Sequence, residues 1–255
     1  MQHLVLGKMK NIHYTAAARA LRNLADPARA GVPDAPGFGA AGWRAATSQG
    51  YFKHSVGDIF LGVTTPAQRK LAKQFQQMSL PNVRRLMKSK VHEERSLANE
   101  ILRLKFQKGS PDQQQEIFNF YVKNLGLIHG WDSVDGSAPY IMGCYLLNRE
   151  KKLLYKLAVS PRIWDRRIAV VSTLWFIRRG DTRPTMKIAR MLLEDREDLI
   201  HKATGWMLRE VGKQKPQVLL EFLDKHSTTM PRTMLRYAIE RFPEDKRQRY
   251  LRKVN

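Results

Sequence analysis

The spacing of apolar residues predicts helices along most of the chain after residue 65. Leu97, Ile101 and Leu104 fall on one face at helical spacing within the segment 83–106. An earlier helix is expected to open with Thr65 as its N-cap and Pro66 at its first helical position. The same pattern continues over 111–128, 165–181, 183–213 and 216–226. Glycine, proline and short polar clusters separate these segments, and no strand pattern is convincing, so the sequence predicts an all-α fold.

A weak internal repeat runs through the helical region. Similar helix starts recur, each with a charged residue at a corresponding place, 34 to 37 residues apart: Arg95, Asp132, Arg167, Lys202 and Arg236. The period predicts stacked helix pairs, an α-solenoid within a single domain over 1–255 whose concave face is basic. Any run of helix–loop–helix units gives a similar period, so this alternative stays open.

The segment 27–50 differs from the rest, because it is rich in Ala, Gly and Pro and poor in large apolar residues. It predicts a mobile surface loop or an insertion. Within it, GFGAAG at 37–42 has the form of a dinucleotide-binding loop. Such a site needs a preceding strand, but Pro33 and Pro36 stand where that strand would be, which excludes it.

The charge of the chain points to a polyanionic partner. Lys and Arg number 45 against 23 Asp and Glu, for a formal net charge of +22. Nucleic acid fits best and an anionic membrane surface second, while a generically basic protein is the plain alternative. The single cysteine, Cys144, excludes an internal disulfide and indicates a reducing compartment. With no long apolar run and no export signal, we expect a cytoplasmic monomer with no membrane partner.

The sequence offers no metal-binding or nucleophile motif. Its seven histidines are scattered, and HEER at 92–95 is only half of a zinc-protease motif. Ser133 has no histidine in a plausible local arrangement. We therefore expect neither a metal nor a cofactor.

The stretch WDSVD at 131–135 combines an indole with two carboxylates. On a helix, Trp131 and Asp135 lie four residues apart and share a face. Asp132 is a good N-cap, and Asp135 at the third helical position would suit both a capping box and the helix dipole. Spacing alone therefore favours neither of two interpretations of Asp135, a helix cap or a functional carboxylate.

Two further clusters suit a nucleic-acid surface. Trp206 has Arg209 three residues later and Lys202 one turn before, so a base could stack while the cations meet phosphates. A half-buried Trp with snorkelling cations is the structural alternative. Arg166 and Arg167 stand at a helix start, where amides and guanidinium groups together favour an anion.

Several separated blocks, in order, resemble the DNA alkylation repair family, the AlkD-like bacterial alkylpurine DNA glycosylases built of HEAT-like repeats. The strongest blocks are GWDSVD (130–135), IWDRRIAVVSTLWFIRRGD (163–181), EDLIHKATGWMLREVGK (197–213) and MPRTMLRYAIERF (230–242). FLGVTTPAQRKLAK (60–73) and KSKVHEERSLANEIL (88–102) are similar to the same family. The resemblance covers roughly residues 51–250.

The resemblance implies a monofunctional N-glycosylase that releases N3- and N7-alkylated purines from duplex DNA, without strand-cleaving lyase activity and without a base-flipping pocket. It implies that Asp135 is the catalytic carboxylate and that the indoles of Trp131 and Trp206 line the lesion. It further implies that Arg167 and Arg209 hold the DNA backbone. An aromatic residue precedes the FLG block in the family, and here that residue is Tyr51.

Two other functions stay open at this point. One is a non-catalytic binder of distorted or branched DNA on the same scaffold. The other is a helical-repeat scaffold for protein partners, which does not explain the net charge of +22. Release of a free base separates the first alternative from the enzyme, and the salt dependence of binding separates the second.

Overall fold

The fold is a computed structural model that describes residues 13–30 and 57–252. These residues form helices and, apart from an isolated parallel bridge between Ile59 and Val91, no strand pairing. The all-α prediction is therefore confirmed. The chain divides into two compact units, residues 1–137 (unit 1) and 138–255 (unit 2). The single domain over 1–255 stays a prediction.

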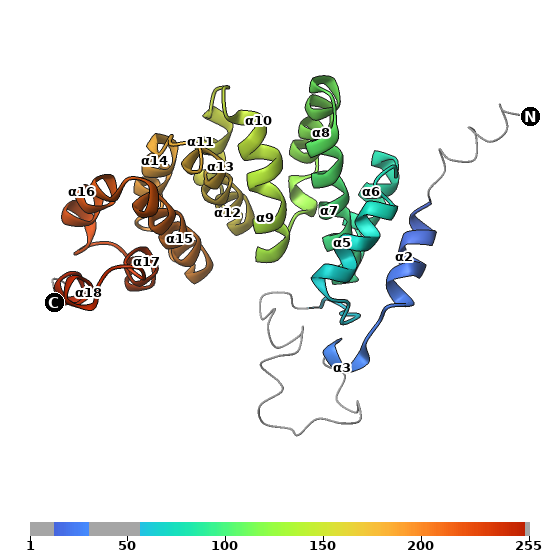
Figure 1. The fold of residues 1–255 in the computed structure, drawn as a ribbon, viewed down its shortest axis with the longest axis horizontal. Coiled ribbons are helices and arrows are strands. Elements are labelled where there is room, and N and C mark those ends of the chain that lie inside the picture. The colour runs from blue at the N-terminus through green and yellow to red at the C-terminus, as the bar shows by residue number, and fades with distance from the viewer. Residues whose placement is uncertain (1–12, 31–56, 253–255) are drawn as a thin grey trace, which may run out of the picture. The chain divides into compact units, whose positions relative to one another are not determined.

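Unit 1 is built of helices that pack around one long central helix. Its elements are α2 (Tyr14–Arg22), α3 (Pro27–Ala30), α5 (Thr65–Gln74), α6 (Leu80–Met87), α7 (His92–Lys108), α8 (Pro111–Lys123), the 3-10 turn η1 (Leu125–Leu127) and α9 (Trp131–Ala138), which ends across the unit boundary. Helix α7 contacts α5, α6 and α8, and α2 packs on α5, α6 and α7 (Figure 1). Leu97 and Ile101 on α7 are fully buried, as their spacing predicts, whereas Leu104 is half-buried.

Two sequence predictions about unit 1 need adjusting. Helix α5 begins at Thr65, so Thr64 and not Thr65 is its N-cap residue, and Pro66 occupies the second helical position. In the predicted loop 27–50, residues 27–30 form the short helix α3, and 31–50 lie outside the described residues.

Unit 2 continues the same construction. Its elements are the π-helix η2 (Pro139–Gly143), α10 (Cys144–Leu146), α11 (Lys152–Ala158), α12 (Ile163–Ser172), α13 (Leu174–Ile177), α14 (Arg183–Met191), α15 (Asp198–Gln214), α16 (Pro216–His226), α17 (Arg232–Ala238) and α18 (Glu244–Arg252). Helix α12 packs on α15, and α15 packs on both α16 and α17. The members of this row, α12, α15 and α17, carry the repeated cations.

Close helix crossings in unit 2 depend on two glycines. A Cβ atom on Gly143 would lie 2.2 Å from the carbonyl oxygen of Ser172, at the contact of η2 with α12. A Cβ atom on Gly205 would lie 2.5 Å from the carbonyl oxygen of Met234, at the contact of α15 with α17. A side chain at either position would push two backbones apart, so both helix pairs need glycine there.

The helix boundaries correct the alignment of the repeats. Arg167, Lys202 and Arg236 are each the fifth residue of their helix, α12, α15 and α17. The fifth residue of α9 is Asp135, whereas Asp132 is the second. Counted from the helix start, Asp135 corresponds to these three cations, whereas Arg95 is the fourth residue of α7.

Candidate active site and nucleic-acid interface

Helix α9 presents the indole and the carboxylate on the same partly open face. Ser133, Val134 and Ser137 are buried on its opposite side. Trp131 and Asp135 are both half-buried and lie one turn apart, a spacing that places Cβ atoms about 5–6 Å from each other. The described part of unit 1 thus confirms that the two residues share a helical face.

The space beside Gly136, the next residue after Asp135, is open among the described residues. A Cβ atom added to Gly136 would meet none of their atoms within 4 Å. A substrate could therefore approach the backbone of α9 next to the carboxylate.

The last turn of α9 is anchored to α8 by buried hydroxyl groups. The hydroxyl groups of Tyr121 and Ser137 are 2.8 Å apart, and the Ser137 hydroxyl donates to the carbonyl of Ser133 at 2.6 Å. Full burial raises the pKa of the Tyr121 phenol, so it stays protonated at any physiological pH.

Asp132 is not the N-cap of α9. The helix begins at Trp131, directly after Gly130 with its φ of +88°, so Asp132 lies inside the first turn. The Oδ2 atom of Asp132 is 2.9 Å from Nε2 of His92, at the start of α7. The prediction that this carboxylate only caps a helix is therefore wrong, because it bonds a side chain 40 residues away.

His92 also faces a second carboxylate. Its Nδ1 atom is 3.4 Å from Oδ2 of Asp58, and Arg95 forms an ion pair with the same oxygen. The imidazole stacks on Phe60 with the ring centres 4.8 Å apart. Burial lowers the pKa of His92, but the hydrogen bond and charge of Asp132 outweigh it, so the pKa is raised above the ordinary 6.5.

The two glutamates of HEER fix the neighbouring segments. The Glu93 carboxylate accepts from the backbone N–H groups of Leu61 and Gly62, at 3.0 and 2.8 Å. The Glu94 carboxylate pairs with Arg22 at 3.0 Å and accepts from the Tyr14 hydroxyl at 3.3 Å. The two glutamates thus join α7 to neighbouring segments of unit 1 and are not half of a zinc site. In the sequence, the only sign of this role was a run of consecutive charged residues at the start of a helix.

In unit 2, Arg166 and Arg167 are held by the protein itself. Arg167 is 5 % exposed, and its Nη1 donates to the carbonyl of Leu199 at the start of α15, at 2.6 Å. The Arg166 guanidinium pairs with Asp195 at 2.6 Å and also donates to the Ser160 carbonyl. Both arginines therefore tie α12 to the segment before or within α15.

Helix α15 carries the second indole between two cations. Trp206 is half-buried, with Lys202 one turn before it and Arg209 three residues after it. Lys202 pairs with Asp198 at 2.7 Å, and this hydrogen bond is the main cause of its raised pKa. Arg209 forms ion pairs with Glu240 and, at 3.8 Å, with Glu210.

The remaining predicted residues are placed as follows. Arg236 on α17 is exposed, whereas Tyr51 lies outside the described residues. The structure thus brings Trp131 and Asp135 together in unit 1, and Lys202, Trp206 and Arg209 together on α15 in unit 2.

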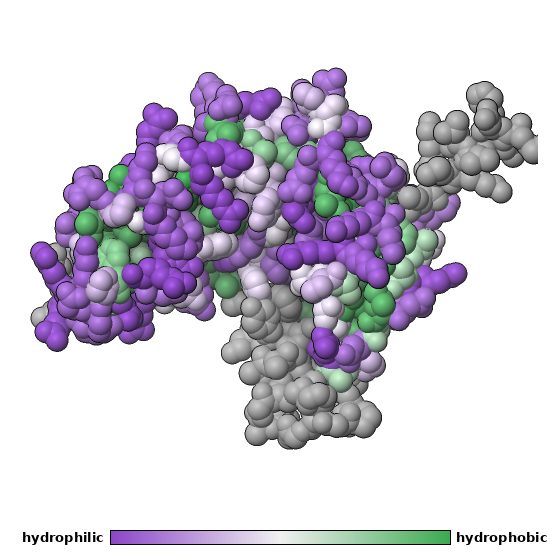
Figure 2. Space-filling view, viewed as in Figure 1, coloured by the Kyte–Doolittle hydropathy of each residue, from purple (hydrophilic) through white to green (hydrophobic). Residues whose placement is uncertain are grey.

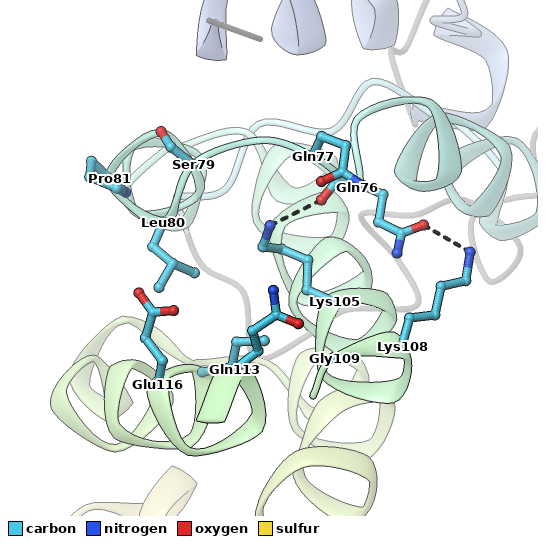
Figure 3. A pocket seen from close by; sticks show the side chains of 11 residues that line it. Gln76, Gln77, Ser79, Leu80, Pro81, Lys105, Lys108, Gly109, Gln113 and Glu116 are labelled. Carbon is cyan, nitrogen blue, oxygen red and sulfur yellow. Dashed lines mark hydrogen bonds between the residues drawn. The ribbon is translucent and has the colours of Figure 1, made fainter. Parts of the chain in front are cut away.

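A cavity of about 580 Å³ lies at the far end of α7, away from His92. Figure 3 shows the side chains of Lys105 and Lys108 turned toward Gln76, to whose oxygens their ammonium groups donate at 3.3 and 3.0 Å. Burial lowers the pKa of Lys105. Since α7 has 17 residues, the cavity lies about 20 Å from the His92–Asp132 contact.

Hydrophilic side chains cover most of the described residues on the face that Figure 2 shows. Among those residues, no cluster of His, Cys, Asp and Glu could hold a metal ion. None of the described helices has the length and apolar character needed to cross a membrane.

A chain of net charge +22 whose described residues form helices, with the half-buried Trp206 between Lys202 and Arg209, is typical of nucleic-acid-binding proteins. Residues 40–242 match the family described as DNA alkylation repair enzyme, and the chain belongs to that family. Membership gives it a role in DNA repair with DNA as its partner. No curated protein matches the chain.

One solved protein structure is similar to this chain in its fold. It is described as a predicted DNA alkylation repair enzyme from Enterococcus faecalis. The match has a TM-score of 0.62 at 19% sequence identity and covers 82% of this chain and 100% of that chain.

Proposed function

We propose that the protein is a monofunctional DNA N-glycosylase that removes cationic alkylated purines, of the 3-methyladenine and 7-methylguanine type, from duplex DNA. The observation that carries the proposal is the half-buried Asp135 one turn from Trp131, on a face of α9 with open space beside it. The proposal includes a monomer that acts in the cytoplasm and needs no metal or cofactor.

The chemistry suits a single carboxylate. Alkylation at N3 or N7 places a positive charge on the purine, so the glycosidic bond is weakened and the base leaves as a neutral molecule. The sugar then develops oxocarbenium character, and a carboxylate stabilises it. One charge pair at about 4 Å is worth about 4 kcal/mol at an effective dielectric constant near 20, or roughly three powers of ten in rate.

Asp135 would also direct the attacking water. A carboxylate that faces the sugar can orient that water or accept its proton while the base departs. No lysine needs to form a Schiff base, so the phosphodiester chain stays intact after the base is released.

The tryptophans and cations would hold the lesion and the duplex. Trp131 and Trp206 would contact the charged base and its deoxyribose through cation–π and CH–π interactions. Arg209 and Arg167 would meet phosphates, together with further predicted contacts from Arg166, Lys202, Arg236 and Tyr51. For Arg166, Lys202 and Arg209, a phosphate would compete with a carboxylate partner that each already has.

An open face on α9 fits an enzyme that does not extrude the base into a narrow pocket. Such an enzyme avoids the few kcal/mol that extrusion costs, and it would tolerate bulky alkyl groups.

The proposal is tested by release of free 7-methylguanine from methylated duplex DNA, measured for the wild type and for Asp135→Asn. We expect Asp135→Asn to release base about a thousandfold more slowly while binding DNA at least as tightly. Asp181→Asn is the matched control, because it removes the same charge from a residue that pairs with Arg183 at 2.9 Å. Equal release by wild type and Asp135→Asn would remove Asp135 from its role.

The same experiment separates the enzyme from the non-catalytic alternative. A wild-type protein that binds DNA junctions tightly but releases no base would be a binder of distorted DNA. Cleavage of the strand along with base release would contradict the monofunctional mechanism.

A further inference from the structure

His92 lies in a position that connects three segments of unit 1. It is 5 % exposed at the start of α7, and its two ring nitrogens face Asp132 on α9 and Asp58 before α5. Phe60 covers one face of the ring. These contacts leave the imidazole one orientation, with each nitrogen directed at a carboxylate oxygen.

The two carboxylate contacts determine how many protons the His92 ring must carry. A neutral imidazole has one N–H donor and one lone pair, and an ionised carboxylate can only accept. Both contacts are hydrogen bonds only when the ring carries two protons. Two carboxylates, His92 in this form and Arg95 give a cluster whose formal charges cancel.

Helix α9 depends on such contacts for its position. It is the first part of a continuous helical run, which passes through the π-helix η2 into α10, so the start at Trp131 is its only helix end. The first turn is held by His92 through Asp132, and a later turn by Tyr121 through Ser137. Asp132 is three residues from Asp135 and next to Trp131, so the first of these contacts fixes the turn that carries the candidate site.

We propose that His92 is a positioning residue for the reaction: its imidazolium group holds Asp132, and through it the turn of α9 that presents Trp131 and Asp135 to the DNA. The inference rests on the proposed glycosylase function. His92 itself touches neither the base nor the sugar.

The proposal has a consequence for pH. The groups that face the ring are Asp132 from α9, Asp58 from the segment before α5 and Arg95 from α7 itself. When the ring loses a proton, one of its two carboxylate contacts changes from a hydrogen bond to a repulsive contact between lone pairs. The rate of base release by the wild type should therefore fall as pH rises through the pKa of His92.

The test compares His92→Gln with His226→Gln. His226 is a half-buried histidine of unit 2 whose ring lies tilted against Phe222, with the ring centres 4.7 Å apart. Single-turnover release of 7-methylguanine is measured with enzyme in excess, together with the Kd for the same DNA. We expect His92→Gln to lower the rate constant by about ten- to a hundredfold at an unchanged Kd, because a small displacement of a catalytic group costs rate more than binding. We also expect the alkaline fall of the rate to disappear in His92→Gln and to persist in His226→Gln.

A second measurement needs no catalysis. The protonation of His92 and the indole N–H resonance of Trp131 are followed by NMR in the wild type, Asp132→Asn and Asp181→Asn. We expect Asp132→Asn to lower the pKa of His92 and to move the Trp131 resonance but not that of Trp206, and Asp181→Asn to change neither.

The outcomes separate the two proposals. A wild type that releases no base defeats the proposed function, while altered Trp131 and His92 signals in Asp132→Asn still support the positioning role. An active wild type overturns the positioning role if His92→Gln keeps the full rate, or if Asp132→Asn leaves both resonances unchanged.

Discussion

At the scale of single residues, the burial of a charged side chain determines whether it contacts the protein itself or is exposed to DNA. Arg167 and Arg236 are both fifth residues of their helices, but Arg167 is buried against the Leu199 carbonyl whereas Arg236 is exposed. A sequence pattern cannot separate the two, because both are arginines at the same repeat position. Burial gives Arg167 a structural contact that it would have to keep or exchange when it meets a phosphate, whereas Arg236 is exposed to a phosphate directly.

We therefore expect Arg167→Ala and Arg236→Ala to differ. Arg167→Ala should lower the free energy of unfolding by about 2–4 kcal/mol, since it leaves a buried carbonyl without its charged donor and removes packing. Arg236→Ala should stay within about 0.5 kcal/mol of the wild type and instead weaken DNA binding. Urea unfolding and a DNA titration check both, and equal unfolding midpoints would contradict the structural role of Arg167.

His92 gives the stability a pH dependence of known sign. Its pKa is raised in the folded protein, so the stabilisation is fully present below about 6.5, the unfolded value, and is lost as pH rises through the folded pKa. The free energy of unfolding should carry this loss in the wild type and in His226→Gln but not in His92→Gln. Urea unfolding at a series of pH values measures it, and parallel curves for all three proteins would exclude the effect.

At the scale of helices, glycines mark where backbones touch and where they do not. Gly205 lies against the backbone of α17, whereas Gly136 on α9 faces open space. Both are helical, so the cost of glycine to the helix is similar at the two positions. The surroundings alone determine what a methyl group would do.

Gly205→Ala and Gly136→Ala form a matched pair. Gly205→Ala should destabilise the fold by about 1–3 kcal/mol, because the α15–α17 contact must open. Gly136→Ala should stabilise it by about 0.5–1 kcal/mol. If Gly136→Ala is more stable and yet releases base more slowly, DNA approaches the backbone beside Asp135; a destabilised Gly136→Ala would contradict the open space there.

The helices themselves followed from the sequence, because the burial of Leu97 and Ile101 repeats at a local period. The pairing of Trp131 and Asp135 on one face followed for the same reason. The bond of Asp132 to His92 did not, since it joins residues 40 apart whose contact depends on how α7 and α9 pack. The burial of Arg167 was missed in the same way, because its partner is a backbone carbonyl 32 residues later.

At the scale of the whole molecule, the net charge of +22 is the dominant property. Many basic side chains are already paired, such as Arg166 with Asp195 and Lys202 with Asp198. Basic side chains outnumber acidic ones, so positive charge remains to bind DNA phosphates. This charge should attract DNA of any sequence.

Binding to duplex DNA should therefore depend steeply on salt. A protein that meets 6–10 phosphates loses about three to five powers of ten in affinity between 50 and 200 mM salt. The logarithm of the binding constant against the logarithm of salt concentration gives the slope, which Arg236→Ala should reduce by about one. A slope near zero would favour a scaffold for protein partners.

The residue at the fifth position of α9 determines whether the protein would repair damaged DNA or only bind it. With Asp135 changed to Lys, the fifth residues of α9, α12, α15 and α17 would all be cationic. If the proposed function holds, such a protein would grip damaged duplexes more tightly and release nothing. It would act as a decoy that shields lesions from other repair enzymes, so one acid separates a repair protein from an inhibitor of repair.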